Sequence, residues 1–246
     1  MLRGTLFFVL LGFASLLNAA SLDAHAIMKK VDKNMRGNTI YMQIAMKITA
    51  FGHERTMKMK IRAAGKKRSF VKIIYPPKER GITFLNLDDQ MWQYIPKIER
   101  TIKIPASMML QNWMGSDITN DDMVKQSSIV DDYDAKLLKR EGKIVTIELI
   151  PHEDAAVVWG KIISRIDTST YTDMQDVYYD EDGKKVRIFT YKNVKKVGKY
   201  FLPMYWKVTP VDEKGHYTEL RIEDVKYDLH ISEQYFKKSA LKRFSR

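Results

Sequence analysis

The sequence lacks cysteine altogether across its 246 residues. This absence excludes disulfide bonds, cysteine-ligated zinc, a thiol nucleophile and a lipid attached through an N-terminal cysteine. The chain also lacks a linker, a low-complexity tract and an internal repeat, so we expect one domain over residues 21–246. A chain of this length can draw its stability from a hydrophobic core, because it buries roughly 70% of its unfolded surface.

Long hydrophobic runs are also missing, except at the N-terminus. There, Arg3 precedes an apolar run from Leu6 to Leu17, which ends at the small residues Ala19 and Ala20. This order predicts a cleaved secretory signal peptide at residues 1–20. The alternative is an uncleaved anchor, but the run is shorter than the roughly 20 residues of a membrane-spanning helix. We therefore expect an exported mature protein.

Patterns typical of enzymes are absent as well. The five histidines are scattered, no Gly-x-Ser-x-Gly elbow occurs, and no histidine pair has metal-binding spacing. His152 and His216 lie in stretches that we interpret as turns. We therefore expect no enzymatic activity, no catalytic residue, no cofactor and no metal site.

Lysine and arginine outnumber acidic residues by 42 to 30, a net charge of +12 at pH 7. Such a charge favours acidic partners, either anionic lipid head groups or nucleic acid. The sequence contains no recognisable DNA-reading helix, RNA-binding aromatic signature or zinc finger, so we do not expect a nucleic-acid partner.

Hydrophobic periodicity predicts one helix followed by a long run of strands. Residues 21–35 have apolar side chains four apart, and Ser21 is placed to cap a helix. From Ile40 onward the period becomes two, which is typical of strands with one apolar and one polar face. The stretches that show it most clearly are IYMQIAMKI (40–48) and RTMKMKIR (55–62).

About ten such strands follow, and several are joined by hairpin turns such as EGK, EDGK and EKGH. A basic helix over residues 232–244 closes the chain. This order predicts a mainly β (α+β) fold, either one large, strongly curved antiparallel sheet or a partly open barrel.

An acidic and methionine-rich segment near residues 105–127 interrupts the strands. A short helix is expected from Ala106 to Met114, and Thr119 with Asp122 fits a capping box at the start of a second helix. Replacing Asp122 by Asn should then cost about 1 kcal/mol or less of stability. The alternative for the acids is a cation site of Asp117, Asp121 and Asp122. We interpret the segment as a helical lid over a cavity, with ordinary core packing as the alternative.

Two arginines are unusual because strand parity places them with apolar neighbours. Arg100 is in phase with Ile102 and Ile104, and Arg80 is in phase with Ile82. A charge on an apolar face is costly unless it is paired or near solvent. Each is therefore expected either in a salt bridge at the sheet rim or in contact with a lipid phosphate or lid carbonyls.

The segment from Tyr75 to Val124 closely resembles the outer-membrane lipoprotein-sorting protein family, a branch of the LolA/LolB-like superfamily. The resemblance rests on RGITFL, MWQYIPKIERTIKI and WMGSDITNDD. It implies a half-open antiparallel β-barrel whose concave apolar face is covered by helices. It also implies a periplasmic protein that binds the acyl chains of lipoproteins or related lipids without covalent chemistry.

The resemblance carries further expectations about partners. Because the chain has no cysteine, it looks like the soluble carrier type, which is expected to be monomeric. An inner-membrane permease of the RND type, or a lipoprotein exporter, is implied as its partner. The founding carrier latches its lid with an Arg-Pro pair, but Ala63 follows Arg62 here and parity turns Arg62 to the polar face. The latch is therefore not transferred.

The sequence thus predicts a carrier that moves acyl chains between membrane partners. The alternative is a periplasmic adaptor that acts only through protein contacts, with its cavity filled by its own lid. The residues expected to bind ligand lie on the apolar face, at its rim or on the lid: Met57, Met59, Ile61, Trp92, Tyr94, Arg100, Met108, Met109, Leu110, Trp113 and Met114.

Overall fold

The computed structural model describes residues 23–125 and 129–246. The predicted signal peptide therefore lies outside the described residues. Among those residues, no helix has both the length and the apolar character needed to cross a membrane.

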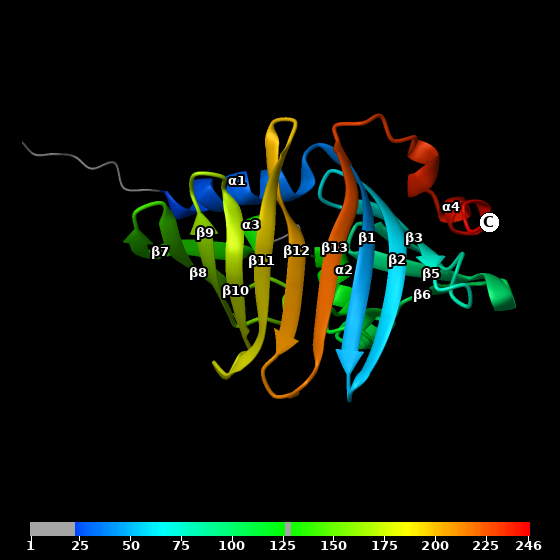
Figure 1. Ribbon diagram of the computed structural model, residues 1–246, viewed down its shortest axis with the longest axis horizontal. Helices are drawn as coiled ribbons and strands as arrows, with labels where there is room; N and C mark the ends of the chain where they lie inside the picture. Colours follow the sequence, from blue (N-terminus) through cyan, green and yellow to red (C-terminus); the bar gives the residue numbers. More distant parts are fainter. Residues whose placement is uncertain (1–22, 126–128) are drawn as a thin grey trace, which may run out of the picture.

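The described chain folds around one antiparallel sheet of thirteen strands (Figure 1). In sheet order it runs β6-β5-β4-β3-β2-β1-β13-β12-β11-β10-β9-β8-β7, so β6 and β7 are the two edges. The mainly β, curved and open antiparallel fold expected from the sequence is confirmed. The strands are β1 (Thr39–Ala50), β2 (His53–Ala64), β3 (Arg68–Tyr75), β4 (Thr83–Leu87), β5 (Gln90–Ile95), β6 (Arg100–Lys103), β7 (Tyr133–Glu141), β8 (Ile144–Pro151), β9 (Lys161–Asp167), β10 (Thr172–Tyr179), β11 (Lys185–Val197), β12 (Tyr200–Pro210) and β13 (Tyr217–Tyr227).

The sheet consists of two hairpin meanders, β1 to β6 and β7 to β13, which are joined by pairing of β1 with β13. Ile44 lies opposite Ile222, and Met46 lies opposite Leu220. The central strands run across the end strands in Figure 1, which shows how strongly the sheet twists and curves. Residues 104–132 connect the two edges, so we call this segment the connection.

Alternation of side chains explains why the sheet has a continuous inner core. On β2, Met57 and Met59 are buried, whereas Lys58 between them is partly exposed. Met59 lies opposite Ile44 of β1, so the apolar faces of neighbouring strands coincide. A slip of one residue would turn these methionines to solvent, and the pattern therefore fixes the register.

Helices and 3₁₀ turns are short, apart from α1. They are α1 (Ala24–Arg36), η1 (Pro96–Ile98), η2 (Ala106–Met108), η3 (Trp113–Gly115), α2 (Asn120–Lys125), α3 (Ile129–Asp132), η4 (Glu233–Phe236) and α4 (Lys238–Arg243).

Helix α1 crosses the inner side of the sheet, beside β10 and β12 (Figure 1). It is capped by Asp23, whose carboxylate accepts a hydrogen bond from the backbone amide of His25 at 3.0 Å. The predicted cap, Ser21, lies outside the described residues. The side chain of Asn34 donates to the carbonyls of Thr170 and Tyr171, at 2.8 and 3.0 Å. These bonds fasten α1 to the turn between β9 and β10.

A second, smaller core lies on the other face of the sheet, where the C-terminal segment packs. Phe70 and Leu85 are fully buried there against Ala240 and Leu241 of α4. The predicted basic helix over residues 232–244 is instead two pieces, η4 and α4. Lys237 between them has extended backbone angles, φ −116° and ψ 148°, which break the helix.

Leu241 should be essential for holding the C-terminal segment on the outer face. We expect Leu241→Ala to lower the free energy of unfolding by about 2–5 kcal/mol, because it removes a fully buried side chain. Leu138→Ala is the matched control, since Leu138 is 48% exposed and should cost about 0.5 kcal/mol or less. Denaturant titration measures both losses, and equal losses would show that α4 does not pack as described.

Candidate functional site

An apolar hollow lies between the inner face of the sheet, helix α1 and the connection. It has two adjoining compartments, with empty volumes of about 930 and 1210 Å³ that include space open to solvent. The residues that line both compartments come from strands on both sides of the β1–β13 junction and from the connection. They are Met42, Ile61, Met123, Ile129, Tyr178, Tyr191 and Trp206.

The first compartment is the more apolar of the two. Its remaining walls include Met46, Met59, Ile118, Trp159 and Phe189. The second compartment extends beneath α1 and is bounded by side chains of mixed polarity. This larger compartment is lined by Met28, Val31, Asp32, Met35, Arg36, Ile40, Ala63, Gly65, Lys66, Lys67, Arg68, Ser69, Val71, Asn86, Val124, Val130, Ser164, Asp173 and Asp176, besides the shared residues.

The connection does not contain the helix predicted from Ala106 to Met114. Two 3₁₀ turns, η2 and η3, replace it, and a β-bridge between Asn112 and Thr119 lies across them. Met114 adopts a left-handed backbone conformation, with φ 51° and ψ 27°, which ends any regular helix at that point. The stretch therefore forms a compact loop.

Trp113 anchors this loop in the core. It is 1% exposed, and its ring lies 5.1 Å from that of Phe84 on β4. Its backbone amide donates to the carbonyl of Ile118 at 2.7 Å. This hydrogen bond closes the loop, and the Trp113 ring packs against the inner face of the sheet.

Four further contacts tie the connection to the sheet. Arg55 donates to the carbonyl of Met114 at 3.1 Å. The Asn86 side-chain amide donates to the carbonyl of Met123 at 2.7 Å. The other two join Thr218 to Asp117 at 2.6 Å and Arg187 to Asp122.

The pairing of Arg187 with Asp122 is a largely buried ion pair. The Arg187 side chain is 4% exposed, and both of its terminal nitrogens donate to the Asp122 carboxylate. The guanidinium also lies 4.2 Å from the ring centre of Trp159 and 4.7 Å from that of Tyr178. A charge at this depth requires its partner, so the pair fixes α2 over β11.

The predicted capping box is confirmed by its two reciprocal bonds. The backbone amide of Asp122 donates to the Thr119 hydroxyl at 3.1 Å, and the amide of Thr119 donates to the Asp122 carboxylate at 2.7 Å. Sequence reasoning missed the second task of Asp122. The signal was Arg187, which strand parity places in phase with the apolar Phe189 and Tyr191.

The aliphatic candidates are distributed unevenly around the hollow. Met59 lines the first compartment and Ile61 lines both, whereas Met57 is fully buried in the core beside them. On the connection, Met109 and Met114 pack partly buried against the core. Met108 is 38% exposed and Leu110 is 57% exposed, so these two side chains face solvent.

Trp92 and Tyr94 lie away from the hollow. Strand parity turns them to the outer face, where they pack with Phe70 and Leu85 under α4, while Met91 beside them faces inward. The sequence of β5 has apolar side chains on both faces, so its pattern did not indicate which face lines the hollow. We therefore leave Trp92 and Tyr94 out of the proposed site.

The two arginines expected on an apolar face are both exposed. Arg100 begins the edge strand β6, all four residues of which are exposed. Arg80 is exposed and donates to the carbonyl of Ile74 at 3.2 Å. Arg62 is also on the outer face, as parity predicted, with its guanidinium 4.4 Å from the Tyr235 ring centre.

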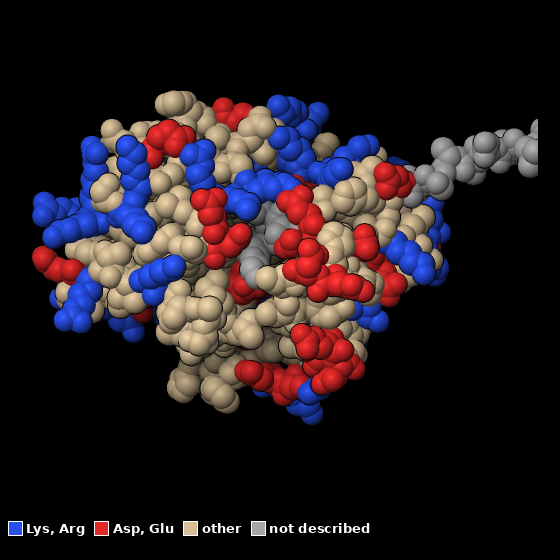
Figure 2. Space-filling view, turned by 180° about the vertical axis from the view of Figure 1, so that it is seen from behind, with Lys and Arg blue, Asp and Glu red and all other residues tan. Residues whose placement is uncertain are grey.

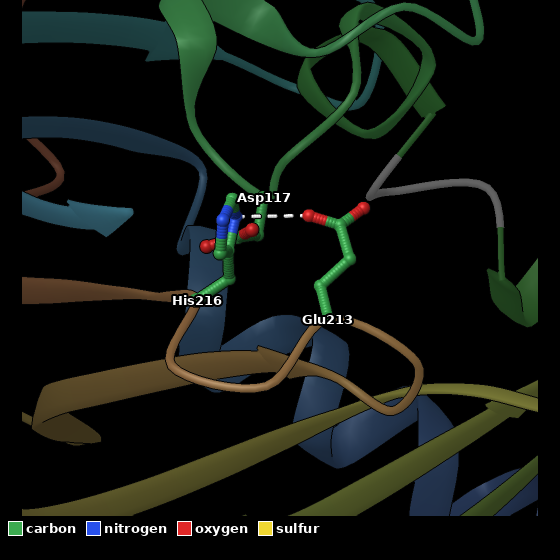
Figure 3. A group of neighbouring side chains, drawn as sticks. All are labelled: Asp117, Glu213 and His216. Atoms are coloured by element: carbon green, nitrogen blue, oxygen red, sulfur yellow. Dashed lines mark ion pairs between the residues drawn. The ribbon is translucent and has the colours of Figure 1, made fainter. Parts of the chain in front are cut away.

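One group of side chains could hold a divalent cation. Potential ligand atoms of Asp117, Glu213 and His216 lie within 4.8 Å of one another (Figure 3). His216 Nδ1 is 2.9 Å from a Glu213 carboxylate oxygen, and burial raises the pKa of Asp117 although the Thr218 hydroxyl opposes this. The cation site of Asp117, Asp121 and Asp122 that the sequence offered as an alternative is not formed, because Asp122 is paired with Arg187.

A pair of buried acids on β10 borders the second compartment. Burial raises the pKa of Asp176 to about 6, although hydrogen bonds from Ser164 and Tyr191 oppose the shift. Burial, with the neighbouring charge of Asp176, also raises the pKa of Asp173 well above its ordinary value. Sequence reasoning missed this pair because the β10 pattern, TDMQDVYY, contains a bulge between Asp173 and Gln175 that disturbs its alternation.

Loss of the Asp122 carboxylate should be far more costly than a capping role alone implies. We expect Asp122→Ala to lower the free energy of unfolding by about 3–5 kcal/mol, because Arg187 is left buried without its partner. Glu54→Ala, which breaks the exposed pair with Lys47, is the control and should cost about 1 kcal/mol or less. A loss for Asp122→Ala no larger than that of the control would refute the structural role of the pair.

The acid pair on β10 predicts a pH dependence of stability. Raised folded-state pKa values mean that the folded protein holds protons more tightly than the unfolded chain. The stabilisation that results from these bound protons is full below about pH 4 and is lost as the pH rises through about 6. The double variant Asp173→Asn, Asp176→Asn lacks these titrating groups. The difference between its free energy of unfolding and that of the wild type should therefore shift in its favour by about 2 kcal/mol or more from pH 4 to pH 7.5. Urea titrations at both pH values measure the gain, and an unchanged difference would contradict it.

Comparison with known proteins supports the fold on independent grounds. A family model with the description "-like: Uncharacterized protein" matches residues 65–243. The search of curated proteins found no match.

Three similar solved structures share the architecture, and each aligns over 89% of this chain. A DUF1329 family protein from Desulfovibrio piger has a TM-score of 0.81, 22% identity and 97% of its own chain covered. A domain described as an outer membrane lipoprotein-sorting protein, from Vibrio parahaemolyticus, has a TM-score of 0.79, 22% identity and 98% covered. A LolA superfamily protein from Nitrosomonas europaea has a TM-score of 0.75, 19% identity and 100% covered.

These matches confirm the resemblance found in the sequence. The family model spans well over half of the chain, and at these identities the solved structures establish the shared fold. The chain belongs to the family that this model describes, and its fold is that of the lipoprotein-sorting proteins of the LolA superfamily.

Proposed function

We propose that this protein is an exported periplasmic carrier that holds the acyl chains of lipoproteins or lipids in its hollow. It would pass them between membrane partners without covalent chemistry, with an inner-membrane permease as one such partner. The observation that carries the proposal is the apolar space between the sheet and the connection, which is lined by side chains such as Met42, Ile61 and Trp206. Ligand pockets in proteins are concave and mostly lined by hydrophobic and aromatic side chains.

The walls of the hollow suit acyl chains in particular. Methionines at positions 42, 59 and 123 line it together with aromatic rings such as Trp206. Unbranched methionine side chains adapt to apolar ligands of different shapes. Each CH₂ group removed from water contributes about 0.8 kcal/mol, so one long chain gains useful affinity without a polar anchor.

The connection is the lid of this proposed carrier. It joins the two edges of the sheet and is held by a few specific contacts, including Arg187 with Asp122 and Arg55 with the Met114 carbonyl. Separation of the connection from the sheet would open the first compartment, since Ile118 and Met123 form part of its wall. Trp113, the buried side chain that anchors the connection against Phe84, would keep the hollow closed between loads.

One end of the molecule suits a negatively charged membrane. Figure 2 shows basic side chains gathered at the end that carries β6 and α4. Lys97, Arg100 and Lys103 are exposed there, as are the apolar side chains of Ile98 and Ile102, at 55% and 40%. This combination of basic and apolar side chains favours an anionic lipid surface.

Filling the hollow should weaken chain binding without disturbing the surface. We expect Met42→Trp to weaken binding of a fluorescent fatty acid by about tenfold or more, because Met42 lines both compartments and a larger ring occupies their shared space. Met174→Trp is the matched control, since Met174 is 38% exposed and should bind as the wild type does. Fluorescence titration gives the dissociation constants.

Two outcomes would contradict the carrier proposal. If the wild type shows no saturable binding, the adaptor alternative is favoured, in which the connection fills the hollow and the protein acts only through protein contacts. If Met42→Trp and Met174→Trp bind equally well, the chain binds elsewhere on the molecule.

A further inference from the structure

Asp173 and Asp176 form a carboxyl pair in the wall of the second compartment. The two residues are 9% and 6% exposed and lie on the inner side of β10. Thr172 and Tyr178 on the same strand are also buried. The pair therefore meets the hollow, not the outer solvent.

The two carboxyl groups are incompletely paired within the protein. The Tyr191 hydroxyl donates to Asp176 Oδ2 at 2.8 Å, and Ser164 also interacts with the Asp176 carboxyl group. Among the described residues, the Oδ1 atoms of both Asp173 and Asp176 are buried and have no hydrogen-bond partner. An unpaired buried oxygen is costly, so two of them on a cavity wall call for a partner from outside the chain.

The basic residues of the same compartment are already paired. Arg36 forms an ion pair with Asp32, and Arg68 forms one with Glu233. Lys67 lies 3.7 Å from Asp89, and Lys66 forms an ion pair with Asp131. These four side chains are therefore paired with acids other than Asp173 and Asp176.

The chemistry of the pair selects a hydrogen-bond donor, preferably a positively charged one. Burial keeps a proton on the pair, and the remaining negative charge would repel a carboxylate or phosphate group, whereas an ammonium group offers donors and the opposite charge together. The rest of the compartment is apolar at Met28, Val31 and Val124, which suits an attached hydrocarbon chain. A hydroxyl group would supply a donor without the charge.

We propose that the second compartment binds an amphiphile whose ammonium group is held between Asp173 and Asp176 and whose hydrocarbon chain follows the apolar walls. This inference rests on the proposed carrier function and narrows its ligand class. A free alkylamine and an aminolipid headgroup supply the same ammonium chemistry.

Three probes with the same twelve-carbon chain test the proposal, namely dodecylamine, dodecanol and dodecanoate, each titrated by calorimetry at pH 7 below its micelle concentration. The wild type should bind dodecylamine about tenfold or more tighter than the other two, as charge-assisted hydrogen bonds are the stronger ones. The Asp173→Asn, Asp176→Asn double variant should lose this preference. It keeps the shapes of both side chains, and circular dichroism verifies that it folds.

Glu181→Gln with Asp182→Asn is the matched control, because it also replaces two carboxyl groups by amides, at two exposed positions of the β10–β11 turn. This control should keep the preference for dodecylamine. A second pair of probes, short-chain phosphatidylethanolamine and phosphatidylglycerol, distinguishes the sources of the ammonium group. Preference for dodecylamine alone identifies a free amine, and preference for phosphatidylethanolamine as well identifies a lipid headgroup.

The outcomes separate this inference from the carrier function. If the wild type binds all three twelve-carbon probes equally, or if the double variant keeps the preference, the ammonium site is overturned while the carrier function stands. If none of the probes binds to any variant, the carrier function itself fails, and the inference with it.

Discussion

The pairing of β1 with β13 is the contact on which the rest of the architecture depends. It joins two meanders that are distant in sequence, with Ile44 opposite Ile222 and Met46 opposite Leu220. Because both apolar faces point to the same side, their union creates one curved inner surface. It also leaves β6 and β7 as the two edges, so the segment between them must cross from one edge to the other.

The connection covers the inner face of the sheet and forms part of the wall of the hollow. The connection is anchored by Trp113 in the core and by Arg187, whose buried guanidinium is neutralised by Asp122. The same hollow contains an acid pair, Asp173 and Asp176, whose raised pKa values follow from burial.

Much of this structure could be predicted from local patterns in the sequence. Alternation in β1 and β2 identified Met59 and Ile61 on the inner face, and the turn sequences identified the hairpins. The capping box at Thr119 and Asp122 was also readable, because a cap depends only on residues three apart.

What could not be predicted depends on residues that are distant in sequence. Trp92 was expected in the hollow but faces α4, a helix almost 150 residues further along the chain. The partner of Asp122 is Arg187, and only the folded sheet brings the two together. The continuous helix expected near Ala106 fails for a related reason, since burial of Trp113 against Phe84 outweighs local helix preference.

The 14 methionines of the sequence can report where a bound acyl chain lies. Methyl-labelled methionines would be observed by NMR while a spin-labelled fatty acid is added. If the hollow holds the chain, broadening should be strong at Met42, Met59 and Met123, which line it, and should not exceed the background at the exposed Met174. Broadening confined to Met174 and Met108, with the three hollow methionines unchanged, would contradict the claim that the hollow under the connection holds acyl chains.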